Sequence, residues 1–270
     1  MSQTADITLF WGAFWLYLGS FILFAVHTAW GNRKMGIIAS VLFVGGLLLN
    51  TAGLGARWWI STHPPFATMY EYSVTMAWVI ALSFVIFLAR YRRMSIGVFV
   101  SPVLIIVMVI ASMLPKEASK QLMPALQSYW FYIHVTIAAA SEGAFLVAAG
   151  AGAMFLIRGE KEGGGRALPS REVLEELISR AIRFGYPLFF IGALFAGAIW
   201  ARNAWGRFWS WDPKETGALV IALYYTLVLH QNARGRWRGK KLAVASIIGL
   251  VIILFSFLGN LFLGGLHAYI

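Results

Sequence analysis

Apolar residues are concentrated in eight long stretches of this 270-residue chain, and short polar segments separate them. The stretches run roughly over 7–29, 36–56, 71–89, 95–114, 131–157, 184–201, 216–231 and 242–264. A helix needs about 20 apolar residues to cross the hydrocarbon core of a bilayer. Because lipid offers the backbone no hydrogen-bond partners, such segments are expected to be helical. The pattern therefore predicts an all-α integral membrane protein with about eight transmembrane helices.

The composition supports this interpretation, because 60% of the residues are hydrophobic and only 12% are charged. A soluble domain usually has about a quarter of its residues charged. The net charge of +11 is not gathered on a basic face free of apolar sequence, so we expect no nucleic-acid partner. The chain contains no cysteine, which excludes a disulfide, a thiolate ligand or a thiol nucleophile of its own.

Lysine and arginine are distributed unevenly between the two sets of connecting segments. If the N-terminus lies outside, only six of the 22 basic residues fall in outer segments, namely Arg57, Lys116, Lys120, Arg202, Arg207 and Lys214. The remaining 16 fall in inner segments, as the positive-inside rule requires. We therefore expect the N and C termini outside and a cytoplasmic loop at about 158–183. Within that loop, the segment from Pro169 predicts a short amphipathic helix along the inner membrane surface.

The chemistry is concentrated in the second half of the chain, so we divide it into 1–127, with helices one to four, and 128–270, with helices five to eight. Four of the 12 tryptophans fall in 12 residues of the predicted outer loop between spans six and seven. The candidate binding residues of this loop are Trp200, Arg202, Trp205, Gly206, Arg207, Trp209, Trp211, Asp212 and Lys214. An aromatic belt at the membrane interface explains one or two tryptophans, but not this series interleaved with glycine and cations.

Trp205 and Trp209 are four residues apart, so on a helical turn they would share a face. Such an aromatic surface suits a flat apolar ligand such as a porphyrin, whose carboxylates the nearby cations would meet. The loop ends in Asp212-Pro213-Lys214-Glu215, which has the spacing of a capping box with proline at the first helical position. The two acids are therefore helix caps, ligand contacts or both, and the sequence leaves these roles open.

Two of the five histidines fall at the level of the tryptophan loop in the predicted topology. His134 begins span five and His267 follows span eight. A single histidine at an interface often serves only as a polar anchor, but two imidazoles are a common axial pair for haem iron. His230, near the inner end of span seven, is a candidate for a second site within the membrane. His27, His63 and the buried acid Glu142 receive no assigned role.

The segment Trp205-Gly-x-x-Trp209-x-Trp211-Asp212-Pro213-Lys214-Glu215 resembles the WWD signature of the haem-handling protein superfamily. The flanking histidines, the additional His230, the Met69-Tyr70-Glu71 segment and the terminal Gly-Leu-His resemble the CcsA (ResC) branch, which belongs to system II cytochrome c biogenesis. This resemblance implies that His134 and His267 hold haem iron at an outer site. It also implies that His230 holds haem iron at the membrane site, together with a histidine of a partner subunit.

As a function, the resemblance implies a membrane subunit of cytochrome c synthase. It would deliver haem b across the membrane and position it for thioether attachment to an apocytochrome c with a Cys-x-x-Cys-His segment. It also implies a CcsB (ResB)-like partner and a location in the bacterial cytoplasmic membrane or the thylakoid membrane. The chain would supply no catalytic group beyond haem positioning, so whether it is an enzyme by itself stays open.

Two alternative functions carry different expectations. A CcmC-like carrier, which passes haem to a chaperone, shares the loop and the outer histidines but has about six helices and no equivalent of His230. A transporter or permease whose aromatic loop borders a pore would bind no haem. The eight predicted spans and His230 favour the CcsA-like function.

Overall fold

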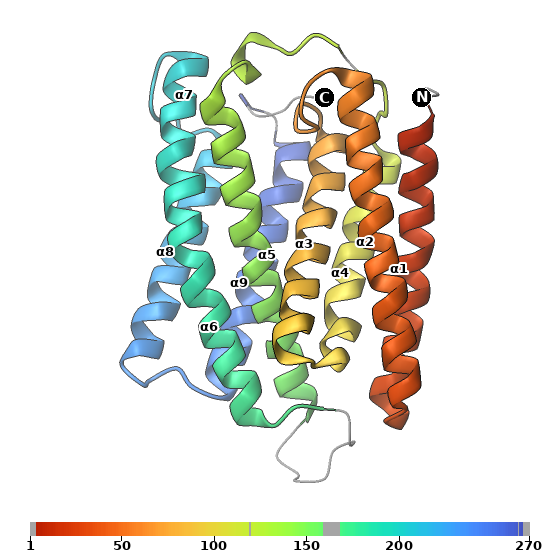
Figure 1. The fold of residues 1–270 in the computed structure, drawn as a ribbon. Helices are drawn as coiled ribbons and strands as arrows, with labels where there is room; N and C mark the ends of the chain where they lie inside the picture. The colour runs from red at the N-terminus through yellow and green to blue at the C-terminus, as the bar shows by residue number, and fades with distance from the viewer. Residues whose placement is uncertain (1–3, 119, 159–167, 264, 267–270) are drawn as a thin grey trace. The chain divides into compact units, whose positions relative to one another are not determined.

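The computed structural model describes residues 4–118, 120–158, 168–263 and 265–266, and the regular elements among them are all helices (Figure 1). The predicted all-α fold is therefore confirmed. The helices form two compact units, one comprising residues 1–121 and 158–170, the other residues 122–157 and 171–270. The division at residue 122 falls a few residues before the boundary expected at 128, and it assigns the segment 158–170 to the first unit.

The first unit contains α1 (Ala5–Trp30), α2 (Arg33–Ser61), α3 (Met69–Tyr91) and α4 (Gly97–Met113). The first two helices form a long antiparallel hairpin (Figure 1). Gly31 ends α1 in the left-handed conformation, with φ of 68°. The Asn32 side chain then caps α2 by accepting hydrogen bonds from the backbone N–H groups of Lys34 and Met35. These local residues determine where the chain reverses.

Aromatic rings fill the centre of the first unit. Phe24, Phe43 and Phe84 are fully buried, and their ring centroids lie 4.9 to 6.2 Å apart. Gly97 allows α4 to approach this cluster, because a Cβ atom at that position would lie 2.4 Å from the Phe24 ring. The packing of α4 against α1 therefore requires glycine at this position.

The second unit contains α5 (Tyr129–Arg158), α8 (Pro213–Ala233), α9 (Lys240–Phe262) and one long continuous helix. That helix consists of α6 (Arg171–Phe189), the π-helical segment η3 (Phe190–Ala196) and α7 (Gly197–Trp205). Most residues of α5 are buried, and its Phe145 ring stacks on Tyr225 of α8 with centroids 3.7 Å apart. At Gly152 of α5, a Cβ atom would lie 2.2 Å from the Ser246 hydroxyl of α9. Small residues on α5 thus allow its neighbours to pack closely.

The separate amphipathic helix expected on the inner membrane surface is a wrong prediction. Helix α6 begins at Arg171 and continues into the apolar stretch, so the loop expected at about 158–183 ends at residue 170. The apolar side chains of Leu174, Leu177 and Ile178 are buried within the protein. An amphipathic pattern shows that one side of a helix is covered, but it does not show whether lipid or protein covers it.

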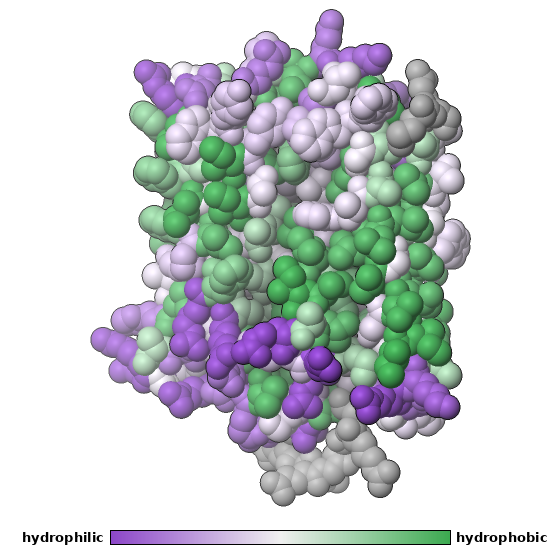
Figure 2. All heavy atoms as spheres, viewed as in Figure 1, coloured by the Kyte–Doolittle hydropathy of each residue, from purple (hydrophilic) through white to green (hydrophobic). Residues whose placement is uncertain are grey.

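The described residues form eight long helices when α6, η3 and α7 are counted as one, which agrees with the eight predicted spans. Seven of these are long and apolar enough to cross a membrane. Helix α8 is not among the seven, because polar residues at both of its ends lower its mean hydropathy. Along the helices visible in Figure 2, hydrophobic side chains cover the middle portions and hydrophilic ones gather at the ends. The helices are those of an integral membrane protein.

Replacing Gly97 by alanine tests the packing of α4. The added methyl group would lie 2.4 Å from the Phe24 ring, so we expect a loss of about 1–3 kcal/mol in unfolding free energy. Thermal unfolding in detergent measures the change. Gly55→Ala is the matched control, because no atom lies within 4 Å of its added Cβ, and it should leave stability unchanged or slightly raised. Equal losses in the two variants would contradict this account.

Candidate functional site

The tryptophan-rich loop connects α7 to α8 at one end of the second unit (Figure 1). Helix α7 ends at Trp205, and Gly206 adopts the left-handed conformation with φ of 78° and donates its N–H to Arg202 O. Because the helix stops there, Trp205 and Trp209 do not share a helical face, and that prediction is wrong. Trp205 instead packs against Trp200, whereas Trp209 contacts Trp211 edge-to-face at 5.7 Å.

The first turn of α8 has the capping box expected from the sequence. The Asp212 carboxylate accepts the Lys214 N–H at 2.8 Å. The Glu215 carboxylate accepts the Asp212 N–H at 3.3 Å and both the N–H and the hydroxyl of Ser210, at 2.7 and 3.0 Å. Both acids are buried, with 5% and 9% exposure. Their capping role is therefore present, and Glu215 also fastens the end of the tryptophan loop to α8.

Several side chains of the loop remain accessible at the surface. Trp211 has a left-handed backbone (φ 61°), which is rare for a bulky residue, and its side chain is 70% exposed. The Arg202 guanidinium donates to Gly206 O and lies over the Phe208 ring. Arg207 is also exposed. The loop thus presents aromatic faces beside arginine side chains.

Trp209 and Trp200 differ in their surroundings. The Trp209 indole N–H is buried and has no hydrogen-bond partner within the described part of the chain. Trp200 is 1% exposed, and its indole N–H donates to Ala125 O at 2.7 Å. Trp200 therefore belongs to the interior of the unit and stands behind the loop rather than on its surface.

His134 on α5 contacts the π-helical segment directly. Its Nδ1 lies 2.8 Å from the Gly192 carbonyl oxygen. A carbonyl only accepts hydrogen bonds, so Nδ1 carries a proton and is the donor in this contact. The imidazole also stacks on Trp200, with an interplanar angle of 9° and centroids 5.6 Å apart. At Gly197, a Cβ atom would lie 2.9 Å from the ring, so the helix opposite leaves space for it.

The second expected ligand, His267, lies outside the described residues. The residue before it, Leu266, is described, and its backbone N–H donates to the second oxygen of Asp212 at 2.6 Å. This contact brings the segment after α9 to the first turn of α8. The start of α5, the end of α7, the start of α8 and the end of α9 all lie at this end of the second unit (Figure 1).

His230 lies in the last turn of α8, at the opposite end of that helix from Asp212. Its side chain is exposed, and Val220, Leu223 and Leu227 are exposed at helical spacing along the same helix. The structure therefore gives α8 an apolar strip that ends in a histidine.

The remaining histidines lie in the first unit and are buried. The Nδ1 atom of His27 lies 3.0 Å from Asn32 O, and its ring packs against Gly36 at the turn between α1 and α2. The Nδ1 atom of His63 lies 3.0 Å from Pro64 O in the connection between α2 and α3. Both contacts are those of residues that stabilise turns. Glu142 is buried within α5.

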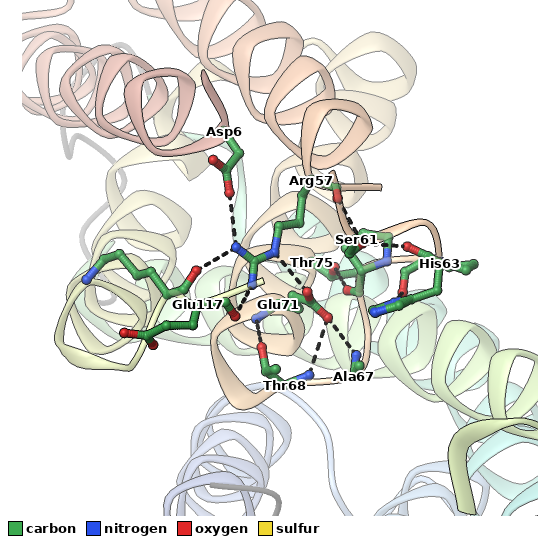
Figure 3. Close-up of polar contacts among 12 residues, drawn as sticks. Asp6, Arg57, Ser61, His63, Ala67, Thr68, Glu71, Thr75 and Glu117 are labelled. Atoms are coloured by element: carbon green, nitrogen blue, oxygen red, sulfur yellow. Dashed lines mark hydrogen bonds and ion pairs between the residues drawn. The ribbon is translucent and has the colours of Figure 1, made fainter. Parts of the chain in front are cut away.

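The sequence did not predict a buried ionic cluster at one end of the first unit, around Arg57 (Figure 3). The Arg57 guanidinium donates to Glu71 at 2.8 Å, to Asp6 at 3.2 Å, and to the carbonyl oxygens of Lys116 and Glu117 at 2.6 and 2.9 Å. The Arg57 side chain is 4% exposed, although the sequence suggested that it lies in an outer loop. The sequence did contain one indication of this cluster. Asp6, Arg57 and Glu71 each lie at the end of an apolar stretch, and the predicted topology places all three ends at the outer face.

Comparison with known proteins identifies similar chains. Residues 66–267 match the family model described as "Cytochrome C assembly protein". The "Cytochrome c biogenesis protein CcsA" of Chlamydomonas reinhardtii is 32% identical over 247 residues, which cover 88% of this chain and 70% of that one. The protein of the same name from Synechococcus sp. (strain CC9902) is 32% identical over 269 residues, and the match covers 88% of each chain.

One solved structure, "Cytochrome c Heme Lyase CcmF", has a similar fold. The TM-score is 0.75 at 16% sequence identity, and the match covers 98% of this chain. This chain spans 49% of the length of that protein. At this identity the likeness concerns the fold alone.

Replacing Arg57 by alanine tests the ionic cluster. The change would leave two buried carboxylates without their cation, so we expect about 3–5 kcal/mol of destabilisation, measured by thermal unfolding in detergent. The control is Arg180→Ala, which removes a half-exposed pair with Glu176 and should cost less than about 1 kcal/mol. An Arg57 variant as stable as the Arg180 variant would contradict the assignment.

Proposed function

The chain belongs to the cytochrome C assembly protein family and has a role in cytochrome c maturation, and from this premise we propose that it is the haem-handling membrane subunit of a cytochrome c synthase. Its task would be to deliver haem b across the membrane to an outer site. There the haem would be positioned for attachment to an apocytochrome c. The activity would belong to a complex with a second membrane subunit of the CcsB (ResB) kind.

The observation that carries this proposal is the orientation of His134. Its Nδ1–H donates to the Gly192 carbonyl, so Nε2 would be the ring nitrogen that binds iron. A backbone carbonyl on the other ring nitrogen is one of the common partners of a histidine that ligates a metal, besides a carboxylate or water. Trp200 would contribute through His134, because its indole stacks on the imidazole and holds the ring plane.

The tryptophan loop would supply the surface for the porphyrin. Trp211 is exposed, and the buried Trp209 indole N–H is a donor that has no partner among the described residues. Arg202, Arg207 and Lys214 would meet the carboxylates of haem. Trp205, Gly206 and Asp212 would maintain the shape of the loop. Together these residues fit a flat ligand with an apolar body and an acidic edge.

His267 would be the second axial ligand at the outer site. Its sequence neighbour Leu266 is hydrogen-bonded to Asp212 at the end of the tryptophan loop. That contact supports a location for His267 at the same end of the unit as His134. Both termini and the loop would lie on the extracytoplasmic side, because the six basic residues counted as outer are far outnumbered by those in inner segments.

His230 would hold haem iron at an earlier site within the membrane. Its exposed side chain, at the end of an apolar strip on α8, supports a role shared with a partner subunit rather than one completed by this chain. The location would be the bacterial cytoplasmic membrane or a thylakoid membrane, and the similar chains from Synechococcus sp. and Chlamydomonas reinhardtii support these two alternatives.

The bond to be formed is a thioether between a haem vinyl group and a cysteine thiol. This chain contains no cysteine, so both thiols would come from the Cys-x-x-Cys-His segment of the apocytochrome. The chain's own contribution would be orientation, which lowers a barrier by up to roughly 7–11 kcal/mol when both reactants are held in place.

His134→Ala tests the outer site. In the purified complex with its partner, the variant should lose the visible absorbance of bis-histidine haem, and a reporter cytochrome c should fail to mature in cells without another assembly system. His27→Ala is the control, because His27 is buried at the α1–α2 turn, and it should lower stability without changing the haem spectrum.

Three outcomes would count against the proposal in different ways. Normal haem content and cytochrome output in the His134 variant would refute the ligand assignment. A wild-type protein that binds haem but matures no reporter would favour a carrier to a chaperone. A wild-type protein without haem would favour a transporter.

His230→Ala tests the membrane site. If haem reaches the outer site by way of His230, this variant should show reduced outer-site haem while the outer ligands are intact. Gln231→Ala, the next residue of the same helical turn, should load normally. Unchanged loading in the His230 variant would refute the delivery route and leave the outer site unaffected.

A further inference from the structure

The carboxylate of Asp212 performs two tasks with its two oxygens. One oxygen caps α8 by accepting the Lys214 N–H at 2.8 Å. The other accepts the Leu266 N–H at 2.6 Å and thereby binds the segment that follows α9. A serine or asparagine caps a helix about as well as aspartate does. The cap alone therefore does not explain an aspartate, whereas the second contact requires a second acceptor oxygen.

Gly265 provides independent evidence that this contact is built into the fold. Its φ of 113° lies in a region that residues with a side chain rarely adopt. A Cβ atom at this position would lie 2.4 Å from the Asp212 carboxylate and 3.0 Å from the Pro213 ring. Only glycine lets the backbone come this close to the first turn of α8. The positive φ of Gly265 and its close approach to Asp212 and Pro213 both require glycine at this position.

The carboxylate is also well placed to hold the segment firmly. Asp212 is 5% exposed, so little water competes for its oxygens. Hydrogen bonds to an ionised group are stronger than those between neutral groups, and a low-dielectric setting strengthens them further. The Asp212–Leu266 contact therefore restrains the backbone next to residue 267.

We propose that Asp212 is a positioning residue that fixes the segment carrying His267 to the end of the tryptophan loop, which we call the Asp212 latch. Glu215 fastens Ser210 to the same helical turn. One turn of α8 thus binds both Ser210 of the loop and the backbone N–H of Leu266. The inference rests on the proposed function, since it takes His267 to be a haem ligand.

The decisive experiment separates the latch from the cap in the intact complex. Asp212→Ser keeps the cap and loses the latch, while Gly265→Ala keeps the carboxylate and obstructs the close approach. Hydrogen exchange at the Leu266 amide should accelerate roughly tenfold or more in both variants. Both should also show a smaller fraction of bis-histidine haem in the visible spectrum, at normal abundance of folded protein.

Two further variants make the result specific. In the double variant Asp212→Ser/Gly265→Ala, Leu266 exchange should be no faster and the loss of bis-histidine haem no larger than in the more affected single variant. The reason is that both substitutions remove the same contact between Asp212 and Leu266. Gly235→Ala is the matched control, since Gly235 also has a positive φ of 70° but its added Cβ would have no neighbour closer than 3.8 Å. It should leave Leu266 exchange and the haem spectrum unchanged.

The outcomes distinguish the latch from the proposed function. Unchanged Leu266 exchange in Asp212→Ser would overturn the latch itself. Faster exchange with a normal haem spectrum would overturn its positioning role, provided that His267→Ala alters the spectrum. A normal spectrum in His267→Ala would instead overturn the ligand assignment of the proposed function, and the positioning role with it.

Discussion

The structure depends on one constraint, which is that backbone N–H and C=O groups within a membrane must find partners in the protein itself. Continuous helices satisfy this constraint over most of the chain. The candidate site lies where helices are interrupted, so backbone groups there need other partners. In the π-helical segment, Gly192 O accepts the Gly197 N–H and still has a lone pair for His134. At the start of α8, Asp212 and Glu215 satisfy backbone N–H groups that the helix leaves unpaired.

Buried charge is handled differently in the two units. In the first unit, two carboxylates and two backbone carbonyls surround the Arg57 guanidinium, so the charge is paired and helix ends are held together. In the second unit, Asp212 and Glu215 bind mainly backbone and hydroxyl donors. The cluster around Arg57 thus connects the ends of α1, α2 and α3. The arrangement in the second unit leaves the nearby arginine side chains at the surface, where they are available to a ligand.

Helix α8 links the two parts of the proposed haem route. Its first turn holds the tryptophan loop and the segment after α9, and its last turn carries the exposed His230. The polar residues at these two ends are also the reason that α8 is less apolar than the seven helices that qualify as membrane spans. The polar residues that make α8 less apolar than a typical membrane span are therefore also the candidate functional groups at its two ends.

The sequence by itself determined the features that depend on neighbouring residues. Hydropathy predicted eight helices, and the Asp212–Glu215 spacing predicted the capping box that the structure contains. The aromatic motif led to the correct family. These signals are local, because a membrane span or a helix cap is decided within about one segment of chain. The local signal failed at Gly206, where a left-handed residue ends α7 and separates Trp205 from Trp209.

Only the tertiary structure decided which distant residues meet. Arg57 pairs with Asp6 across 51 positions, His134 with Gly192 across 58, and Leu266 with Asp212 across 54. Each contact depends on which helix faces pack together and on where a helix is distorted. Apolar periodicity carries neither kind of information, since it shows that a face is covered without identifying the neighbour. The sequence therefore names the ligand candidates, and packing orients the imidazole and restrains the backbone beside the second histidine.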